Sequence, residues 1–227
     1  NLSIFYPFPE RLRGQEGSAA TGPDADSIAY FCNQSLFKLL PQFDQVYPRI
    51  AAKVKNARFW FLRHHSSFVT EKFLHRLRRA FAQAGLKADD HVVLFPRLSE
   101  DEFLRLTRRA EVILDSIQWS GGNSSLEALA CDKPIVTLPG PLMRGRHTYG
   151  ILRRAGIDEL IAADLDHCVE IAVRLGEDAK WRSMLTEKIR EQKPDVFHDR
   201  AAIDGLEDFL LKREITAAQT PRACLEM

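Results

Sequence analysis

Residues 115–140 of the chain read DSIQWSGGNSSLEALACDKPIVTLPG, and this stretch decides the fold. An apolar run at 112–114 precedes it, and a second apolar run occupies 135–138. Between the two runs, a glycine pair at 121–122 leads into residues that favour a helix from Asn123 onward. A strand, a glycine turn, a helix and a second strand within about thirty residues have the length of one βαβ unit. The stretch therefore predicts two parallel strands joined by a helix.

The start of that predicted helix suits an anion. Glycines let the backbone approach a bulky ligand, and Asn or Ser side chains can cap the first turn. Unpaired amides and the positive end of the helix dipole favour a phosphate at such a place. Glycine-rich turns before helices also serve purely as connections. Spacing alone therefore leaves a phosphate site and a plain connection equally open.

Charge and cysteine content exclude several classes of protein. The net charge is +1, from 32 basic and 31 acidic side chains, so no overall field favours nucleic acid or an anionic membrane as partner. The four cysteines form no C-x-x-C pair, which predicts reduced thiols in a cytoplasmic protein without a zinc site. No apolar run approaches the ~18 residues of a membrane span. Because the chain starts at Asn1 and enters an apolar run at once, we expect it to be a segment of a longer polypeptide.

Short apolar runs alternate with helical periodicity along most of the chain. Strands are predicted at 2–6, 28–32, 59–62, 91–95, 112–114, 135–138 and 159–162. Helices are predicted at 43–54, 70–84, 143–155, 166–175, 179–191 and 201–213, besides those that begin near 99 and 123. Gly85 closes the second of these helices as a C-terminal cap, and Ser99 with Glu102 forms a capping box.

The alternation from residue 28 to about 162 predicts an α/β fold, a Rossmann-like parallel sheet with helices on both faces. Residues 1–26 are expected to be a linker and a short strand from a preceding domain. Residues 27–213 form the Rossmann-like domain with its C-terminal helices, and 214–227 form a frayed tail. In such sheets ligands bind beyond the carboxyl ends of the strands. The loops that follow the strands therefore carry the candidate site.

Motifs exclude some ligands and leave a few polar candidates. The chain lacks G-x-G-x-x-G, G-x-x-x-x-G-K-[ST] and G-x-S-x-G, and no His stands at metal-ligand spacing. Lys38 follows the strand at 28–32, where its ammonium could reach a phosphate or simply face solvent. Glu127 lies one turn after Asn123 and could accept both hydroxyls of a ribose or be an ordinary exposed glutamate. Arg146 follows the next strand. This set suits a nucleoside diphosphate.

At this point a family resemblance is evident. The run LDSIQWSGGNSSLEALACDKPIVTLPG, followed by PLMRGRH, resembles the C-terminal catalytic half of the protein O-GlcNAc transferase family, glycosyltransferase family 41. The similarity is greatest to bacterial members linked to tetratricopeptide (TPR) repeats. It extends from LSIFY at 2–6, through FCNQSLFK at 31–38, to the last amphipathic helix.

The resemblance implies a GT-B fold, in which two Rossmann-like domains face each other across a cleft. Residues 27–213 would form the C-terminal domain, which binds the nucleotide sugar, typically UDP-N-acetylglucosamine. The enzyme would transfer the sugar with inversion to Ser or Thr of an acceptor protein, with no metal and no cofactor. The resemblance also implies an N-terminal GT-B half, which would supply the base, and TPR repeats. Neither nucleic acid nor a membrane is an expected partner.

The resemblance assigns roles to individual residues. Lys38 would be catalytic, because it matches the lysine that contacts the diphosphate and stabilises the leaving UDP. Phe103 would lie against the uracil, Glu127 would bind the ribose, and Arg146 would lie beside the cleft. The full set of implied donor-binding residues is Gln34, Ser35, Phe103, Gly121, Gly122, Asn123, Ser124, Glu127 and Arg146.

Two departures from the family pattern keep alternatives open. Glu100 stands where the family has a second lysine, and 122–124 read Gly-Asn-Ser where animal enzymes have His-Thr-Thr. One alternative is a degenerate sugar-nucleotide-binding or scaffolding module without turnover. Another is a different GT-B enzyme that acts on a UDP-sugar. For the transferase itself, we expect the isolated chain to transfer no sugar at a useful rate, because half of the active site would be missing.

Overall fold

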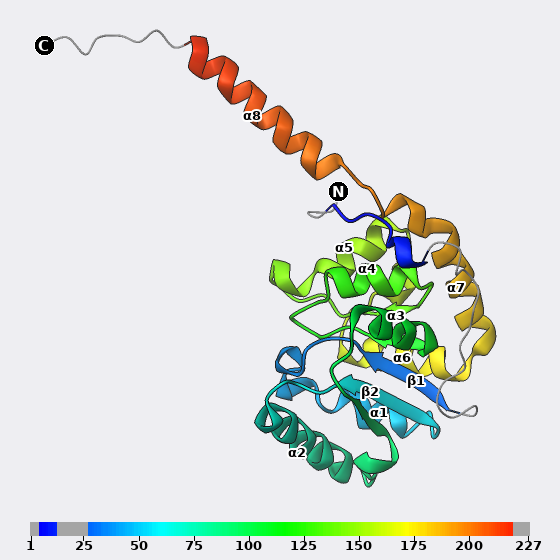
Figure 1. Ribbon diagram of the computed structural model, residues 1–227. Helices are drawn as coiled ribbons and strands as arrows, with labels where there is room; N and C mark the ends of the chain where they lie inside the picture. Colours follow the sequence, from blue (N-terminus) through cyan, green and yellow to red (C-terminus); the bar gives the residue numbers. More distant parts are fainter. Residues whose placement is uncertain (1–4, 13–26, 220–227) are drawn as a thin grey trace, which may run out of the picture.

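The computed structural model of the chain describes residues 5–12 and 27–219 (Figure 1). Five parallel strands form one sheet in the order β3-β2-β1-β4-β5. The strands are β1 (Ile28–Cys32), β2 (Ala57–Leu62), β3 (Val92–Phe95), β4 (Val112–Leu114) and β5 (Ile135–Val136). Their continuous apolar runs suit strands that are covered on both faces. The strand order reverses between β1 and β4, which makes this the place where an open α/β sheet binds its ligand.

Eight α-helices flank the sheet or follow it in the described part of the chain. They are α1 (Val46–Ala51), α2 (Ser67–Gln83), α3 (Glu100–Arg109), α4 (Asn123–Ala130), α5 (His147–Arg154), α6 (Leu165–Glu177), α7 (Ala179–Gln192) and α8 (Ala201–Gln219). Seven short 3₁₀ helices occupy Glu10–Leu12 (η1), Leu36–Lys38 (η2), Pro41–Phe43 (η3), Ala88–Asp90 (η4), Met143–Gly145 (η5), Asp158–Leu160 (η6) and Lys193–Asp195 (η7).

Successive side chains of the strands point to opposite faces of the sheet and build two cores. On one face, Phe31 and Trp60 pack with residues of α3 and α4. On the other face, Tyr30, Phe59 and Phe61 pack with residues of α1, α2 and α6. The prediction of a parallel sheet with helices on both faces is confirmed.

Several local predictions are also confirmed. Ser99 caps α3 and shares a capping box with Glu102. Gly85 has φ +73° directly after α2, as a left-handed C-terminal cap requires. The helix predicted at 43–54 is shorter, Val46–Ala51, and Pro48 lies in its first turn, where the absence of an N–H costs no helical hydrogen bond.

Two predicted elements were wrong. The strand predicted at 159–162 is instead η6, whose turn directs the N–H of Ile161 to Asp158, and a single bridge joins Ile161 to Thr137. The helix predicted at 143–155 is divided into η5 and α5. Gly145 lies so close to the backbone of Gln118 that a Cβ would be 3.1 Å from the Gln118 Cα. The chain therefore turns at 143–146 instead of continuing as one helix.

The two ends of the chain differ from the predictions. The frayed tail was predicted from residue 214, but α8 continues to Gln219, because residues 214–219 favour a helix even without an amphipathic pattern. α8 extends away from the body (Figure 1) and exposes Leu206, Phe209, Leu210 and Leu211. Of the strand predicted at 2–6, only Phe5 and Tyr6 lie in the described part, and they pair with no strand there. The rest of the expected linker, at 13–26, lies outside the described residues. Within the described ranges, no helix is both long enough and apolar enough to cross a membrane.

Candidate functional site

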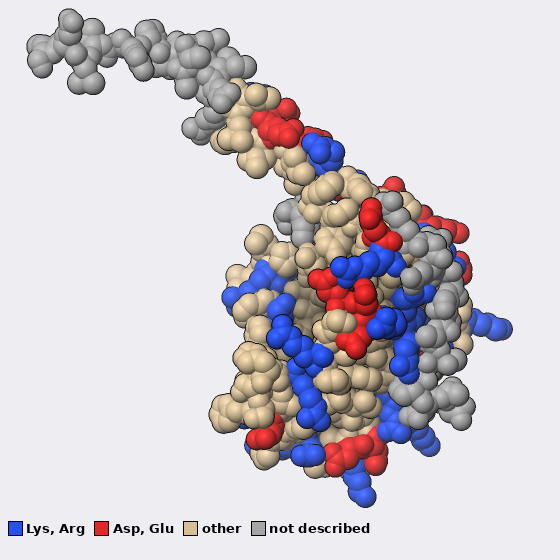
Figure 2. Space-filling view, viewed as in Figure 1, with Lys and Arg blue, Asp and Glu red and all other residues tan. Residues whose placement is uncertain are grey.

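A cleft of about 620 Å³ opens beyond the carboxyl ends of β1, β2 and β3, beside the start of α4. Its volume is in the range of small-molecule sites. It is lined by Asn33, Gln34, Ser35, Leu36, Phe37, Leu62, Arg63, His64, His65, Arg97, Leu98, Ser99, Glu100, Phe103, Asn123, Ser124 and Glu127. Figure 2 shows Lys and Arg side chains gathered along one face of the molecule, beside a group of Asp and Glu.

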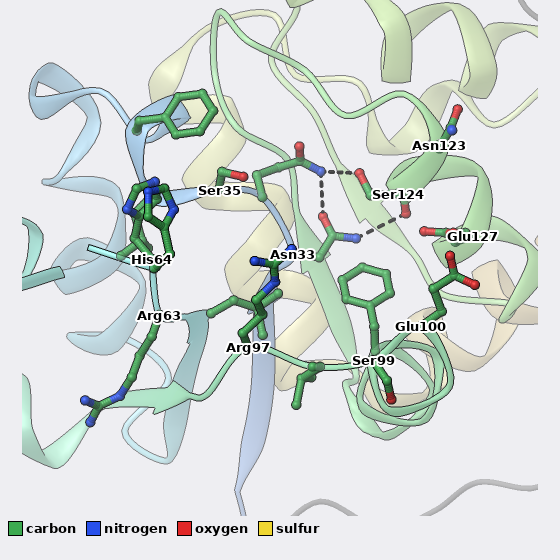
Figure 3. A pocket seen from close by; sticks show the side chains of 17 residues that line it. Asn33, Ser35, Arg63, His64, Arg97, Ser99, Glu100, Asn123, Ser124 and Glu127 are labelled. Atoms are coloured by element: carbon green, nitrogen blue, oxygen red, sulfur yellow. Dashed lines mark hydrogen bonds between the residues drawn. The ribbon is translucent and has the colours of Figure 1, made fainter. Parts of the chain in front are cut away.

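Gln34 is the centre of a polar network that joins β1 to α4 (Figure 3). Its Nε2 donates a short hydrogen bond to Ser124 Oγ and a second one, of 2.9 Å, to Asn33 Oδ1. Asn33 Nδ2 in turn donates to the Ser124 carbonyl at 3.1 Å. Lys38 Nζ donates to Gln34 Oε1 at 2.9 Å. The network fixes the first turn of α4 against the end of β1.

The start of α4 presents free donors. The backbone N–H groups of Gly122, Asn123 and Ser124 donate no hydrogen bond to any residue that the structure describes. Gly122 is the N-cap, and a Cβ at this position would meet nothing within 4 Å, so the approach is open. A Cβ on Gly121, in contrast, would collide with the side chains of Ser125, Gln34 and Ser124. Three free amides at a helix start, with the favourable end of the dipole, can accept an anion.

Asp115 holds the glycine turn in place from beneath. Its carboxylate accepts hydrogen bonds from the backbone of Ser116 (2.9 Å) and Gly121 (2.8 Å) and from the hydroxyls of Ser120 (2.7 Å) and Thr137 (2.8 Å). Burial raises the pKa of Asp115, and the hydrogen bonds from Ser120, Gly121 and Thr137 oppose the rise. The predicted site omitted Asp115, which does not line the cleft but bonds to the turn beside it. Its position directly after β4 was the available signal.

An acidic pair forms one side of the cleft. Glu127 lies in the first turns of α4, and Glu100 begins α3; Figure 3 shows the two carboxylates pointing toward one another. Burial, with the charge of Glu100, raises the pKa of Glu127, whereas a hydrogen bond from Tyr6 and the charge of Arg11 lower it. Glu100 itself pairs with Arg11.

Basic side chains from the loops after β2 and β3 line another part of the cleft. Arg63 and His64 follow β2, and Arg97 follows β3. Arg97 makes no hydrogen bond or ion pair among the described residues, and Figure 3 shows it pointing into the cleft, whereas Arg63 points away. The sequence had marked these loops as candidates without selecting these residues. Phe103 also lines the cleft, and its ring packs on Phe31 at 5.8 Å.

Four predicted residues stand outside the lining: Gly121 and Gly122, which form the turn before α4, and Lys38 and Arg146. Lys38 is held by Gln34 Oε1, and burial lowers the pKa of its ammonium while the charge of Asp115 opposes the shift. Arg146 donates to the Gly140 carbonyl at 3.1 Å and stacks over the ring of Tyr149 at 4.4 Å. The remaining predicted residues lie together at the cleft or in the turn that leads to it. Among the described residues, no cluster of three His, Cys, Asp or Glu side chains could hold a metal ion.

Comparison with known proteins gives one consistent result. The profile of Glycosyl transferase family 41 matches residues 19–201. The chain is 28% identical over 166 residues to the UDP-N-acetylglucosamine--peptide N-acetylglucosaminyltransferase of Caenorhabditis elegans, covering 72% of this chain and 14% of the relative. It is 24% identical over 157 residues to the probable enzyme of that name, SPINDLY, of Arabidopsis thaliana, covering 69% of this chain and 17% of the relative.

Solved structures agree with the sequence matches. An O-GlcNAc transferase mutant of Thermobaculum terrenum matches 86% of this chain with a TM-score of 0.73 and 26% identity. The match covers 37% of that protein. Staphylococcus aureus TarM, solved with UDP, matches 85% of the chain with a TM-score of 0.55 and 12% identity, a likeness that shows the fold alone. The chain thus spans a minor part of each of these relatives.

Proposed function

The chain belongs to glycosyltransferase family 41, and from this premise we propose that it binds the UDP-sugar donor in an inverting protein O-glycosyltransferase. The fold is that of one Rossmann-like half of a GT-B glycosyltransferase. UDP-N-acetylglucosamine is the proposed donor, since the curated relatives are named for it. Ser or Thr of a protein is the proposed acceptor.

One observation carries the assignment of the site: three free amides begin α4 at the sheet's switch point, and a carboxylate follows one turn later. A diphosphate fits the amides of Gly122, Asn123 and Ser124, which carry the positive end of the helix dipole. The ribose then reaches Glu127, and the uracil lies toward Phe103. Both residues line the same cleft as the helix start.

The proposed chemistry needs positive charge where the departing UDP develops an oxyanion. Lys38 and the amides at the start of α4 would supply it, and losing one such donor costs about 10²–10³ in rate. Gln34 holds the Lys38 ammonium at 2.9 Å and also bonds to Ser124, so one side chain connects the proposed catalytic cation to the helix start. No metal enters this proposal.

The acceptor surface and the base would come from an N-terminal half. Exposed apolar side chains next to the cleft support a covering domain there. Phe37 and Trp119 stand edge to face with centroids 6.0 Å apart and are 53% and 40% exposed. Leu142 and Met143, at the start of η5, are also exposed, and Arg144 of η5 lies over the Trp119 ring. TPR repeats in the same polypeptide are proposed on the resemblance alone.

Calorimetric titration of the chain with UDP tests the site. Wild type should bind, and Lys38→Ala should bind at least tenfold more weakly, because the ammonium no longer offsets the diphosphate charge. Lys72→Ala on the exposed face of α2 is the matched control and should bind as wild type does. Equal affinity in wild type and Lys38→Ala, or no binding by either, contradicts the assignment.

A turnover assay separates the enzyme from the alternatives. The chain alone should bind UDP yet transfer no sugar from UDP-N-acetylglucosamine to a peptide, whereas the longer polypeptide should transfer it. A longer polypeptide that binds UDP without turnover would indicate a binding or scaffolding module. Transfer to a small molecule in place of a peptide would indicate a different GT-B enzyme.

A further inference from the structure

The N-terminal segment is fastened to a turn near the other end of the domain. His198 N donates to the Tyr6 carbonyl at 3.1 Å, and Phe8 N donates to His198 Nε2 at 3.3 Å. The rings of Tyr6 and Phe8 lie against Phe197, with centroid distances of 6.4 and 5.1 Å. The backbone and the ring of Tyr6 are therefore both fixed by contacts that do not involve its hydroxyl.

From this anchored position Tyr6 reaches the cleft. Its hydroxyl donates to Glu127 Oε1 at 3.3 Å, across 121 residues of sequence. Burial, together with the neighbouring Glu127 charge, raises the pKa of Tyr6 to about 12, so the hydroxyl keeps its proton at neutral pH. Glu127 Oε2 accepts no hydrogen bond within the part of the chain that the structure describes. One carboxylate oxygen is thus held, and the other is available to a ligand.

The same segment also acts on the second acid of the pair. Arg11 pairs with Glu100 and lies 3.4 Å from Asp101 Oδ1. The Glu100 charge opposes ionisation of Glu127, and the Arg11 charge favours it. Residues 6–11 therefore supply a hydrogen-bond donor to Glu127 and a positive charge to its surroundings. Without them, two carboxylates would face each other with no compensation from this side.

We propose that Tyr6 is a positioning residue of the donor site, which holds the Glu127 carboxylate in the orientation that receives the ribose hydroxyls. This inference rests on the proposed function, because Glu127 is the proposed ribose ligand. The segment that carries Tyr6 is then part of the nucleotide site and not only a connection to it. A carboxylate held in advance loses less freedom when the ligand binds, and this favours affinity.

Calorimetry with two nucleotides tests the role of Tyr6. Tyr6→Phe keeps the ring against Phe197 and removes only the hydroxyl. It should weaken UDP binding about threefold to tenfold, the value of one net hydrogen bond. Binding of 2′,3′-dideoxy-UDP, which offers no ribose hydroxyl, should be the same in both proteins. The matched control is Tyr30→Phe, which deletes a tyrosine hydroxyl that donates to the Ala172 carbonyl at 2.9 Å, away from the cleft.

A pH series gives a readout that a merely structural role would not move. The groups that face the Glu127 carboxylate are Tyr6, Glu100 and Arg11. Because the Tyr6 hydrogen bond lowers the pKa of Glu127, its removal leaves that pKa higher. On lowering the pH, Tyr6→Phe should therefore lose UDP affinity at a higher pH than wild type. Glu127→Gln should show no such acid-side loss from this group.

The outcomes separate the two proposals. If wild type binds no UDP, the proposed function falls and this inference falls with it. If wild type binds UDP and Tyr6→Phe binds it equally well over the pH series, only the inference is overturned. A loss that is as large for 2′,3′-dideoxy-UDP as for UDP also overturns it, since the effect would then not pass through the ribose.

Discussion

Replacement of Gly121 by alanine tests whether the glycine turn is packed as tightly as the structure indicates. A Cβ at this position would collide with Ser125 Oγ and would lie 2.7 Å from Gln34 Nε2 and 2.9 Å from Ser124 Oγ. All three atoms already make hydrogen bonds. Ser125 Oγ is 2.8 Å from Thr148 Oγ1, and Gln34 Nε2 bonds to Ser124 and Asn33. The added methyl group can therefore be accommodated only by moving groups of this network.

The expected loss of stability has two contributions, overpacking and displaced hydrogen bonds. Overpacking costs about 1–3 kcal/mol, and each hydrogen bond that is displaced costs about 0.5–1.5 kcal/mol. We expect Gly121→Ala to lower the free energy of unfolding by about 2–3 kcal/mol. UDP affinity should fall at least tenfold, because Ser124 and Gln34 adjoin the proposed diphosphate site. Gly122→Ala is the matched control, since a Cβ there meets nothing, and it should cost only about 0.5–1 kcal/mol as a poorer N-cap.

Urea unfolding of both variants and of wild type measures the difference, and UDP titration measures the effect on the site. Gly121→Ala within about 0.5 kcal/mol of wild type would refute the packing argument, because the collision would then relax at almost no cost. An equal loss in both variants would refute it as well, since the effect would belong to the turn in general. Adding Ser125→Ala to Gly121→Ala should recover part of the loss, because the closest clashing atom is then absent.

Three further predictions concern the cleft and the fold. Arg97→Ala should weaken the binding of UDP more than that of UMP and leave the binding of uridine unchanged, because Arg97 points into the cleft without a partner among the described residues. Arg63 points away, so Arg63→Ala should alter the binding of none of the three, as measured by calorimetry. Lys193→Met should lower the free energy of unfolding by about 1–3 kcal/mol in urea, because the buried Asp132 carboxylate loses its 2.6 Å partner and keeps only Arg190 at 3.2 Å; an unchanged free energy of unfolding would contradict this. Gly85→Ala should lower it by about 1 kcal/mol, because φ is +73° there, and an unchanged urea midpoint would contradict that reasoning.

Most of the sheet was predictable because its signals are local. Residues 28–32 and 112–114 are buried apolar runs, and both strands have the predicted bounds. Such runs form strands in almost any α/β context, since helices cover both faces. The run at 159–162 has similar composition, but only Ile161 finds a pairing partner. Whether a short apolar run becomes a strand depends on a neighbouring strand edge, which a local pattern does not reveal.

The candidate site likewise has a part that local sequence predicts and a part that depends on distant residues. The glycine turn and the residues after it were predictable, because turn and cap residues follow one another in sequence and report the backbone directly. Asp115 and Asn33 were not assigned to the site. They act through Gly121, six residues along, and through Ser124, 91 residues away. Each looks like an ordinary polar residue at a strand end until the sheet brings β1 and β4 together.

Tyr6 shows where sequence reasoning fails for a physical reason. The sequence predicted a linker and a short strand from a preceding domain at residues 1–26, with Pro7 and Pro9 ending the strand. The same prolines fix the backbone in an extended form without ladder hydrogen bonds, which leaves its groups free for other partners. Tyr6 then binds the Phe197–His198 turn with its ring and backbone and Glu127 with its hydroxyl. These partners lie 121 or more residues away, so no periodicity or spacing could connect them, and only the folded chain makes a linker residue part of the proposed nucleotide site.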